Sequence, residues 1–199
     1  MTEITGRAAE APVERMFPDR WSPRAFTDEA LPPDVLDTFF EAARWAPSVF
    51  NAQPWRFLYA LRGDEHWELF LGLLAEFNRI WAQRAAALVF VVSQGNFRMP
   101  GSDRDTPSYS HSFDAGAAWA NFALQASLSG WAAHGMTGFD HAGAPAALNI
   151  PEGDRVELAV AVGRRGDPAL LPDKLRAREA PSGRLPLARI RRSGPFGAD

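Results

Sequence analysis

The segment at residues 87–93 (ALVFVVS) constrains the fold most, because it is apolar on both of its alternating faces. A strand of this kind is typical of the middle of a sheet that is covered on both sides. Residues 56–61 and 155–163 are further predicted strands, and a turn or short strand is expected at 135–139. The chain therefore needs helices on both faces of one sheet.

Apolar residues at helical spacing predict the helices that supply this cover. They are expected at about 33–45, 65–84 and 113–134, with a short helix at 143–148. The predicted fold is a mixed α/β arrangement of the α+β type, with one sheet and helices on its faces.

The length of 199 residues, of which 46% are hydrophobic, suits one domain of ordinary size. The sequence shows no internal repeat and no second domain boundary. We therefore expect a single domain over residues 1–199, with a loose N-terminal lead at 1–14 and an extended C-terminal tail at 164–199.

Small residues recur along the predicted third helix at intervals of four, three, four and three. They are Gly116, Ala120, Ala123, Ser127 and Gly130. Residues at this spacing share one face, which another helix can approach closely. Two interpretations stay open: tight packing inside one subunit, or a helix at the centre of a homodimer.

The composition argues against several classes of function. Cysteine is absent, which excludes disulfides, cysteine-based zinc and iron–sulfur sites, and thiol catalysis. A net charge of −3 disfavours non-specific binding to nucleic acids. No nucleophile elbow or phosphate-loop motif occurs, and the four histidines lack the spacing of metal ligands, so we expect no metal site.

Neither a signal peptide nor a membrane span is expected. The N-terminus has no apolar core segment, and the longest apolar stretch, residues 85–92, is too short to cross a bilayer. The sequence therefore predicts a soluble, cytoplasmic protein.

Two loops carry side chains suited to ligand binding. In residues 20–24 (RWSPR) two arginines flank a serine, and guanidinium groups suit phosphate oxygens. The alternative is a solvated loop with ordinary salt bridges. Ser48, Asn51 and Gln53 lie between prolines in the second loop, where their donors and acceptors suit the edge of a planar ligand. An amide-capped turn is the alternative there.

Together these segments resemble the nitroreductase family of FMN-dependent oxidoreductases. The family pattern R-x-S-x-R/K-x-F is present at residues 20–26, and A-P-S-x-x-N-x-Q-P-W is present at 46–55. A helix that ends in Gly-Trp is followed by Gly-Phe-Asp at 138–140, and R-x-P-L is present at 184–187. The order and approximate spacing of all four match over about residues 15–190.

The resemblance implies a mostly antiparallel central sheet flanked by helices. It also implies a homodimer with two FMN sites at its interface and with the C-terminal tail wrapped around the partner. The implied reaction is ping-pong: hydride passes from NAD(P)H through FMN to a nitroaromatic, quinone or similar small acceptor. No catalytic side chain is implied because the flavin carries the chemistry, and neither nucleic acid nor membrane is an expected partner.

The resemblance also implies residues that bind the cofactor. Arg20, Ser22 and Arg184 would hold the phosphate and ribityl chain, with Trp21 beside them. Arg24 would lie toward N1 and O2 of the flavin, where a guanidinium stabilises the negative charge of the reduced ring.

Further contacts implied by the resemblance come from three other segments. Those expected to reach the flavin from the other subunit are Pro47, Ser48, Val49 and Asn51. Asn78 would contact the ring. Met136, Thr137 and Gly138 would run along it, with the backbone of Thr137 near N5.

Departures from the family pattern leave the acceptor open. Val49 replaces a serine found in many members, Ser182 a basic residue, and Thr137 an acidic residue near N5. The loop at 95–112 is expected to form a lid over the pocket. The alternatives are a specialised member, such as a dehalogenase, an enoate reductase or a flavin-fragmenting enzyme, a flavin-binding protein without turnover, and an α/β domain that binds no flavin.

Overall fold

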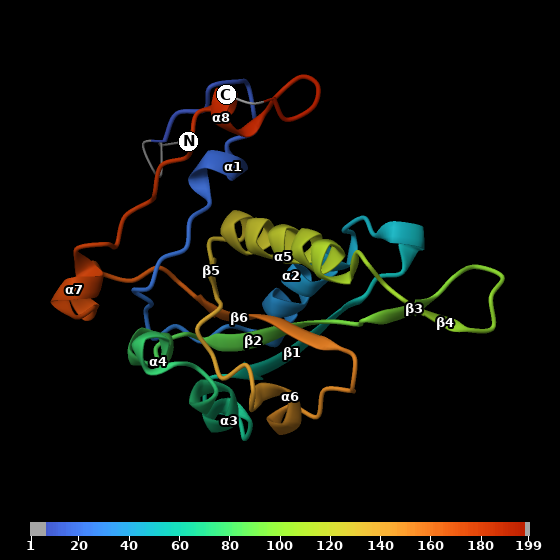
Figure 1. The fold of residues 1–199 in the computed structure, drawn as a ribbon. Helices are drawn as coiled ribbons and strands as arrows, with labels where there is room; N and C mark the ends of the chain where they lie inside the picture. The colour runs from blue at the N-terminus through green and yellow to red at the C-terminus, as the bar shows by residue number, and fades with distance from the viewer. Residues whose placement is uncertain (1–6, 198–199) are drawn as a thin grey trace.

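A four-stranded sheet forms the centre of the computed structural model, which describes residues 7–197. Its order is β1-β2-β6-β5, and every neighbouring pair is antiparallel (Figure 1). The strands are β1 (Trp55–Leu61), β2 (Ala87–Ser93), β5 (Ala132–Met136) and β6 (Arg155–Gly163). Every residue of β2 is buried, as the sequence predicts. The expected α+β fold with an antiparallel central sheet is confirmed.

Helices cover both faces of this sheet (Figure 1). On one face lie α2 (Pro33–Arg44) and α5 (His111–Leu128), and on the other lie α3 (Trp67–Gly72), α4 (Glu76–Ala82) and α6 (Ala144–Ala147). Alternate residues of β2 serve the two cores: Val89 packs toward α2 and α5, whereas Phe90 packs toward the opposite layer. The two-sided burial therefore follows from the apolar pattern of the strand.

A bulge interrupts the pairing of β2 with β6. Val91 faces Leu158 but Val92 faces Val156, so Glu157 is the additional residue. Its Oε1 atom accepts hydrogen bonds from the hydroxyls of Ser93 at 2.6 Å and Ser112 at 2.5 Å. The bulge thereby ties the sheet to the N-terminal end of α5.

The single helix expected at 65–84 is wrong, because this segment forms two helices, α3 and α4. Between them, Leu74 makes a β-bridge with Phe139. The backbone N–H of Ala75 donates to the carbonyl of Gly138 at 3.1 Å, and that of Asp140 donates to Leu73 at 2.8 Å. Tertiary hydrogen bonds thus replace the helical ones at this point.

The helix expected at 113–134 is also wrong at its end, since α5 stops at Leu128. Gly130 has a φ of +77°, and the Trp131 N–H donates to the Ala126 carbonyl at 2.8 Å. This is the geometry of a helix closed by a left-handed glycine. The chain then enters β5, so the strand expected at 135–139 begins three residues earlier.

The polar stretch at 95–112 contains a small hairpin, β3 (Asn96–Arg98) and β4 (Asp105–Pro107). It projects away from the sheet (Figure 1). The ring of Phe97 stacks on that of Phe50 at 6.0 Å between centroids. The role of this segment as a lid stays a prediction.

The two ends of the described chain lie side by side beyond α5, with α1 (Met16–Asp19) and α8 (Leu187–Ile190) close together (Figure 1). We call residues 7–19 and 185–197 the terminal arm. Residues 7–14 of the predicted lead form no helix or strand, whereas residues 1–6, and 198–199 of the tail, lie outside the described part. Wrapping of the tail around a partner stays a prediction.

The first part of the tail packs on its own chain. It holds a short helical turn (Pro168–Leu170) and α7 (Asp173–Arg176), and Leu171 is buried. Oε1 of Glu179 accepts hydrogen bonds from the backbone N–H groups of Arg24 and Ala25. Within residues 7–197, no helix has the length and apolar character needed to cross a membrane.

Candidate functional site

The loop that follows α1 is fixed beside the edge strand β5. Phe26 is fully buried and forms a β-bridge with Arg165, and the Gly166 N–H donates to the Ala25 carbonyl at 2.7 Å. In the described sheet β5 pairs with β6 alone, so its other edge faces this loop and the tail. The fold therefore carries the arginines of residues 20–24 to an unpaired strand edge.

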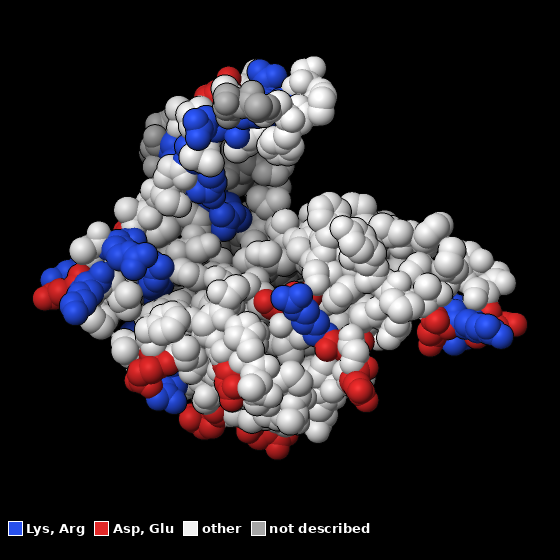
Figure 2. Space-filling view, in the orientation of Figure 1, with Lys and Arg blue, Asp and Glu red and all other residues white. Residues whose placement is uncertain are grey.

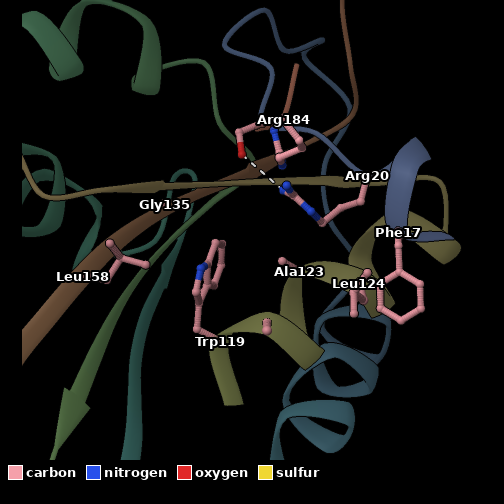
Figure 3. Close-up of a pocket in the computed structure, with 10 residues that line it drawn as sticks. Phe17, Arg20, Trp119, Ala123, Leu124, Gly135, Leu158 and Arg184 are labelled. Carbon is pink, nitrogen blue, oxygen red and sulfur yellow. Dashed lines mark hydrogen bonds between the residues drawn. The ribbon is translucent and has the colours of Figure 1, made fainter. Parts of the chain in front are cut away.

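A cavity of about 470 Å³ lies between this loop and α5. Arg20 and Arg184 approach each other on one side of it, and Trp119 and Leu158 lie on the opposite side (Figure 3). The remaining lining residues are Phe17, Ser22, Ala120, Ala123, Leu124 and Gly135. The volume falls in the range of about 300–1,000 Å³ that is typical of small-molecule sites.

Gly135 keeps this cavity open on the side of the sheet. A Cβ atom at this position would lie 2.7 Å from Cδ2 of Leu158 and 3.0 Å from the ring of Trp119. Any larger residue would therefore displace the two side chains that form the apolar wall.

A second cavity, of about 390 Å³, shares Arg20, Ser22 and Arg184 with the first. Its other lining residues are Arg7, Trp21, Arg24, His134, Arg178, Ala180 and Ser182. The three shared residues therefore border both an apolar cavity and a strongly basic one.

Positive charge in the basic cavity is poorly balanced by carboxylates. Within residues 7–197, no carboxylate lies within 4 Å of the guanidinium groups of Arg7, Arg20 or Arg184. Burial, and then the charge of Arg184, lower the pKa of Arg20. Lys and Arg side chains run from the terminal arm down into a hollow of the surface (Figure 2). Such an arrangement suits an anion.

Arg24 is the exception in this cluster. Its Nη1 atom lies 3.7 Å from Oε2 of Glu179. The other oxygen of this carboxylate is already occupied by the backbone of the loop. Glu179 thus fixes the loop and lies near one nitrogen of the Arg24 guanidinium, which leaves the other nitrogens of Arg24 for a ligand.

His134 lies on β5 beneath the arginine-bearing loop. Its Nδ1 atom is 3.0 Å from the carbonyl oxygen of Pro23, and its ring lies 4.7 Å from that of Trp81. Burial lowers the pKa of His134 to about 4, and the positive charges of Arg24 and Arg20 act in the same direction. The imidazole is therefore neutral at pH 7, and the Nδ1 proton is donated to Pro23.

The residues that are predicted to contact the flavin ring, at the end of β5 and beyond it, differ in burial. The side chain of Met136 is buried in the core, and Thr137 is exposed. Asn78 is buried, and its Nδ2 donates to the Gly138 carbonyl at 2.9 Å. A Cβ atom at Gly138 would overlap the ring of Phe77. Asn78 and Gly138 thus lie in contact at the turn after β5.

The second predicted loop is strained and tightly held. Phe50, Asn51 and Gln53 have φ values of 52°, 55° and 48°, a region that non-glycine residues seldom occupy. The Val49 N–H donates to the buried carboxylate of Asp114 at 3.2 Å. The strain is therefore sustained by contacts with α5.

This second loop does not join the arginine cluster within one chain. None of the predicted residues Pro47, Ser48, Val49 and Asn51 lines the two cavities around Arg20. The loop contacts α5 at Asp114, whereas the apolar cavity touches α5 from Trp119 to Leu124. Five residues of helix, about 7.5 Å, separate Asp114 from the nearest of these positions.

Among the lining residues that sequence reasoning missed are Arg7, Trp119, His134, Leu158 and Arg178. Trp119 and Leu158 belong to elements that were predicted, but only the packing of α5 on β6 shows that they face the same space. Arg7 lies in a segment without any periodic pattern, so no sequence signal marks it.

Comparisons with known proteins show what this chain is similar to. The model of the nitroreductase family matches residues 18–88. The crystal structure of an oxidoreductase containing FMN is 46% identical, covers 100% of both chains and superposes with a TM-score of 0.93. The FMN complex of a nitroreductase-like protein from Desulfovibrio desulfuricans is 25% identical, with a TM-score of 0.70, and covers 95% of this chain and 100% of that one.

A curated relative from Mycolicibacterium smegmatis is also similar. It is an uncharacterised 15.4 kDa protein, 34% identical over 151 residues, which are 71% of this chain and 97% of the relative. With a relative 46% identical over its full length and with the family model matching the loop that bears Arg20 and Arg24, the chain belongs to the nitroreductase family.

Proposed function

We propose that this oxidoreductase binds FMN and passes hydride from NAD(P)H through it to a nitroaromatic, a quinone or a similar small acceptor. One observation carries the proposal: Arg20, Ser22 and Arg184 converge where an apolar cavity meets a basic one. The FMN in two similar structures supports the identity of the cofactor.

The residues at this junction fit FMN in charge and in polarity. A phosphate monoester carries about −1.5 to −2 charges at pH 7, and Arg20 and Arg184 have no carboxylate partner within the described residues. Trp119 and Leu158 offer an apolar surface within the same cavity as these arginines. A ligand with one charged end and one planar apolar end matches both requirements.

Each predicted residue then has a role in binding. Arg20 and Arg184 hold the phosphate, and Ser22 donates its hydroxyl to the phosphate or ribityl oxygens. Trp21 packs beside this chain. Arg24 stabilises negative charge at N1 and O2. FMN supplies the hydride-transfer chemistry when bound, so the protein needs no acid, base or nucleophile of its own.

The turn after β5 supports the ring in this proposal. Asn78 fixes the carbonyl of Gly138, and the backbone N–H of Thr137, an exposed residue, would lie near N5. Met136 anchors the turn in the core. The chain thus positions the reactive edge through backbone groups held by buried side chains.

The site is proposed to be completed by a second copy of the chain. Pro47, Ser48, Val49 and Asn51 line neither cavity of their own chain. Their anchor on α5, Asp114, lies about 7.5 Å along the helix from Trp119, where the apolar cavity begins. On α5, Gly116 and Ala120 are exposed and allow a second helix to approach closely. A homodimer joined through this face would place the strained loop of one subunit at the flavin of the other.

The test is the visible spectrum of the purified protein, followed by anaerobic addition of NADH or NADPH and then of a quinone. A flavin spectrum that bleaches with a nicotinamide and returns with the quinone supports the proposal. A flavin that neither nicotinamide reduces would identify a flavin-binding protein without turnover. A colourless protein that takes up no added FMN would overturn the cofactor assignment.

A further inference from the structure

Arg7 joins two segments of the candidate site, although it lies outside all four family motifs. Its Nη2 atom donates to the carbonyl of Arg20 at 2.6 Å, and its Nη1 atom donates to that of Ser182 at 3.4 Å. One side chain from the N-terminal segment thus contacts both the arginine-bearing loop and the tail before Arg184.

The third nitrogen of this guanidinium has no acceptor in the described residues. The Nε atom of Arg7 is buried and makes no hydrogen bond there. The nearby carboxylate of Asp19 is bound by Arg15 at 2.5 Å. A buried donor attached to a full positive charge is costly unless an anion or another acceptor satisfies it.

Neighbouring charges make the position of Arg7 still more costly. Burial lowers the pKa of Arg7 most, and the charges of Arg184 and Arg20 lower it further. Hydrogen bonds to two backbone carbonyls need only neutral donors, which would not carry this repulsion. The placement of a cation there is therefore explained by a ligand that carries negative charge.

We propose that Arg7 is a third arginine of the ligand site and binds a phosphate monoester together with Arg20 and Arg184. The N-terminal segment thereby forms part of the site. The identity of the ligand as FMN rests on the proposed function, whereas the chemistry of a phosphate group is shared by free phosphate.

The experiment compares Arg7→Gln and Arg7→Met with the wild-type full-length protein after removal of flavin. Dissociation constants are measured for FMN and for riboflavin by flavin fluorescence. Protection by inorganic phosphate is measured as a shift in the unfolding temperature. Arg98→Met is the control, because Arg98 lies on the β3–β4 hairpin and lines neither cavity.

Both Arg7 variants are expected to bind FMN at least about tenfold more weakly, equivalent to about 1.4 kcal/mol. Riboflavin binding should stay unchanged, phosphate should protect the variants less, and Arg98→Met should behave as wild type. Glutamine ends about where Nε of Arg7 lies and cannot reach both carbonyls, so the comparison of FMN with riboflavin separates anion binding from a structural tie.

Three results would contradict either the role of Arg7 or the proposed function. Wild-type affinity of Arg7→Gln for FMN and phosphate would overturn the role of Arg7 and leave the proposed function intact. An equal loss for FMN and riboflavin would overturn it too, because it would show a structural role only. Protection by phosphate that depends on Arg7, in a wild-type protein that binds no FMN, would support the phosphate site and refute the proposed cofactor.

Discussion

The Nδ1 atom of His134 lies 3.0 Å from the carbonyl oxygen of Pro23. This hydrogen bond joins the edge strand to the loop that carries Arg20 and Arg24. It forms with a neutral imidazole, because burial, and then the charges of Arg24 and Arg20, lower the pKa of His134.

This contact predicts a specific dependence of stability on pH. The pKa of His134 is about 4 in the folded protein, against an ordinary value of 6.5. Between these values the unfolded chain binds a proton and the native protein does not, so stability falls as the pH is lowered. The slope reaches at most about 1.4 kcal/mol per pH unit.

Urea unfolding of the wild type and of His134→Gln at pH 7, 6, 5 and 4.5 tests this prediction. The variant should be less stable at pH 7, but its free energy of unfolding should fall less steeply below pH 6.5. Parallel curves for the two proteins would show that His134 does not titrate in this way.

Replacing Arg20 and Arg184 together with methionine should abolish retention of FMN. Each charge-assisted hydrogen bond to phosphate contributes about 1.5–3 kcal/mol. The check is the ratio of flavin to protein after gel filtration, with Arg98→Met on the distant β3–β4 hairpin as the control. Full occupancy in the double variant would remove these residues from the phosphate site.

Gly116→Arg should yield a monomer that releases FMN. A Cβ atom at Gly116 meets nothing within 4 Å, so the variant should fold, while the added charge blocks close approach of a second helix. Gly116→Ala keeps this face small and should remain dimeric. Light scattering coupled to gel filtration gives the mass, and absorbance gives the flavin content. A monomer that keeps its flavin would contradict a site shared between subunits.

Gly138→Ala should destabilise the turn after β5. The added methyl group overlaps the ring of Phe77 and lies 2.7 Å from Nδ2 of Asn78. Overpacking of this kind costs about 1–3 kcal/mol. Gly72→Ala, where a Cβ atom meets nothing within 4 Å, is the control. Equal urea midpoints for the two variants would show that the turn accommodates the added methyl group without loss of stability.

Local patterns predicted the sheet well, because each strand carries its own apolar signature. β2 and β6 lie where the sequence places them. The ends of the helices were predicted less well, since they depend on distant partners: the Gly138 carbonyl interrupts the segment between α3 and α4. Gly130 could have marked the end of α5.

In the candidate site too, residues that are adjacent in sequence were predicted, and residues that depend on distant packing were missed. The motif at residues 20–24 indicated a phosphate site because its residues are adjacent in sequence. Arg7 and Trp119 reach the same cavities only through the packing of the terminal arm and α5. Their contribution is a property of the tertiary structure, which no local pattern encodes.

The sheet ends at β5, and the loop and the tail that carry the arginines run past its unpaired edge. Exposed strand edges are sites at which chains associate and aggregate, and charged side chains beside them oppose this. The arginines that suit an anionic ligand therefore also oppose aggregation at the free edge of β5. A chain shortened before Glu179 would lose part of this protection, and its solubility would fall even though every strand of the sheet is retained.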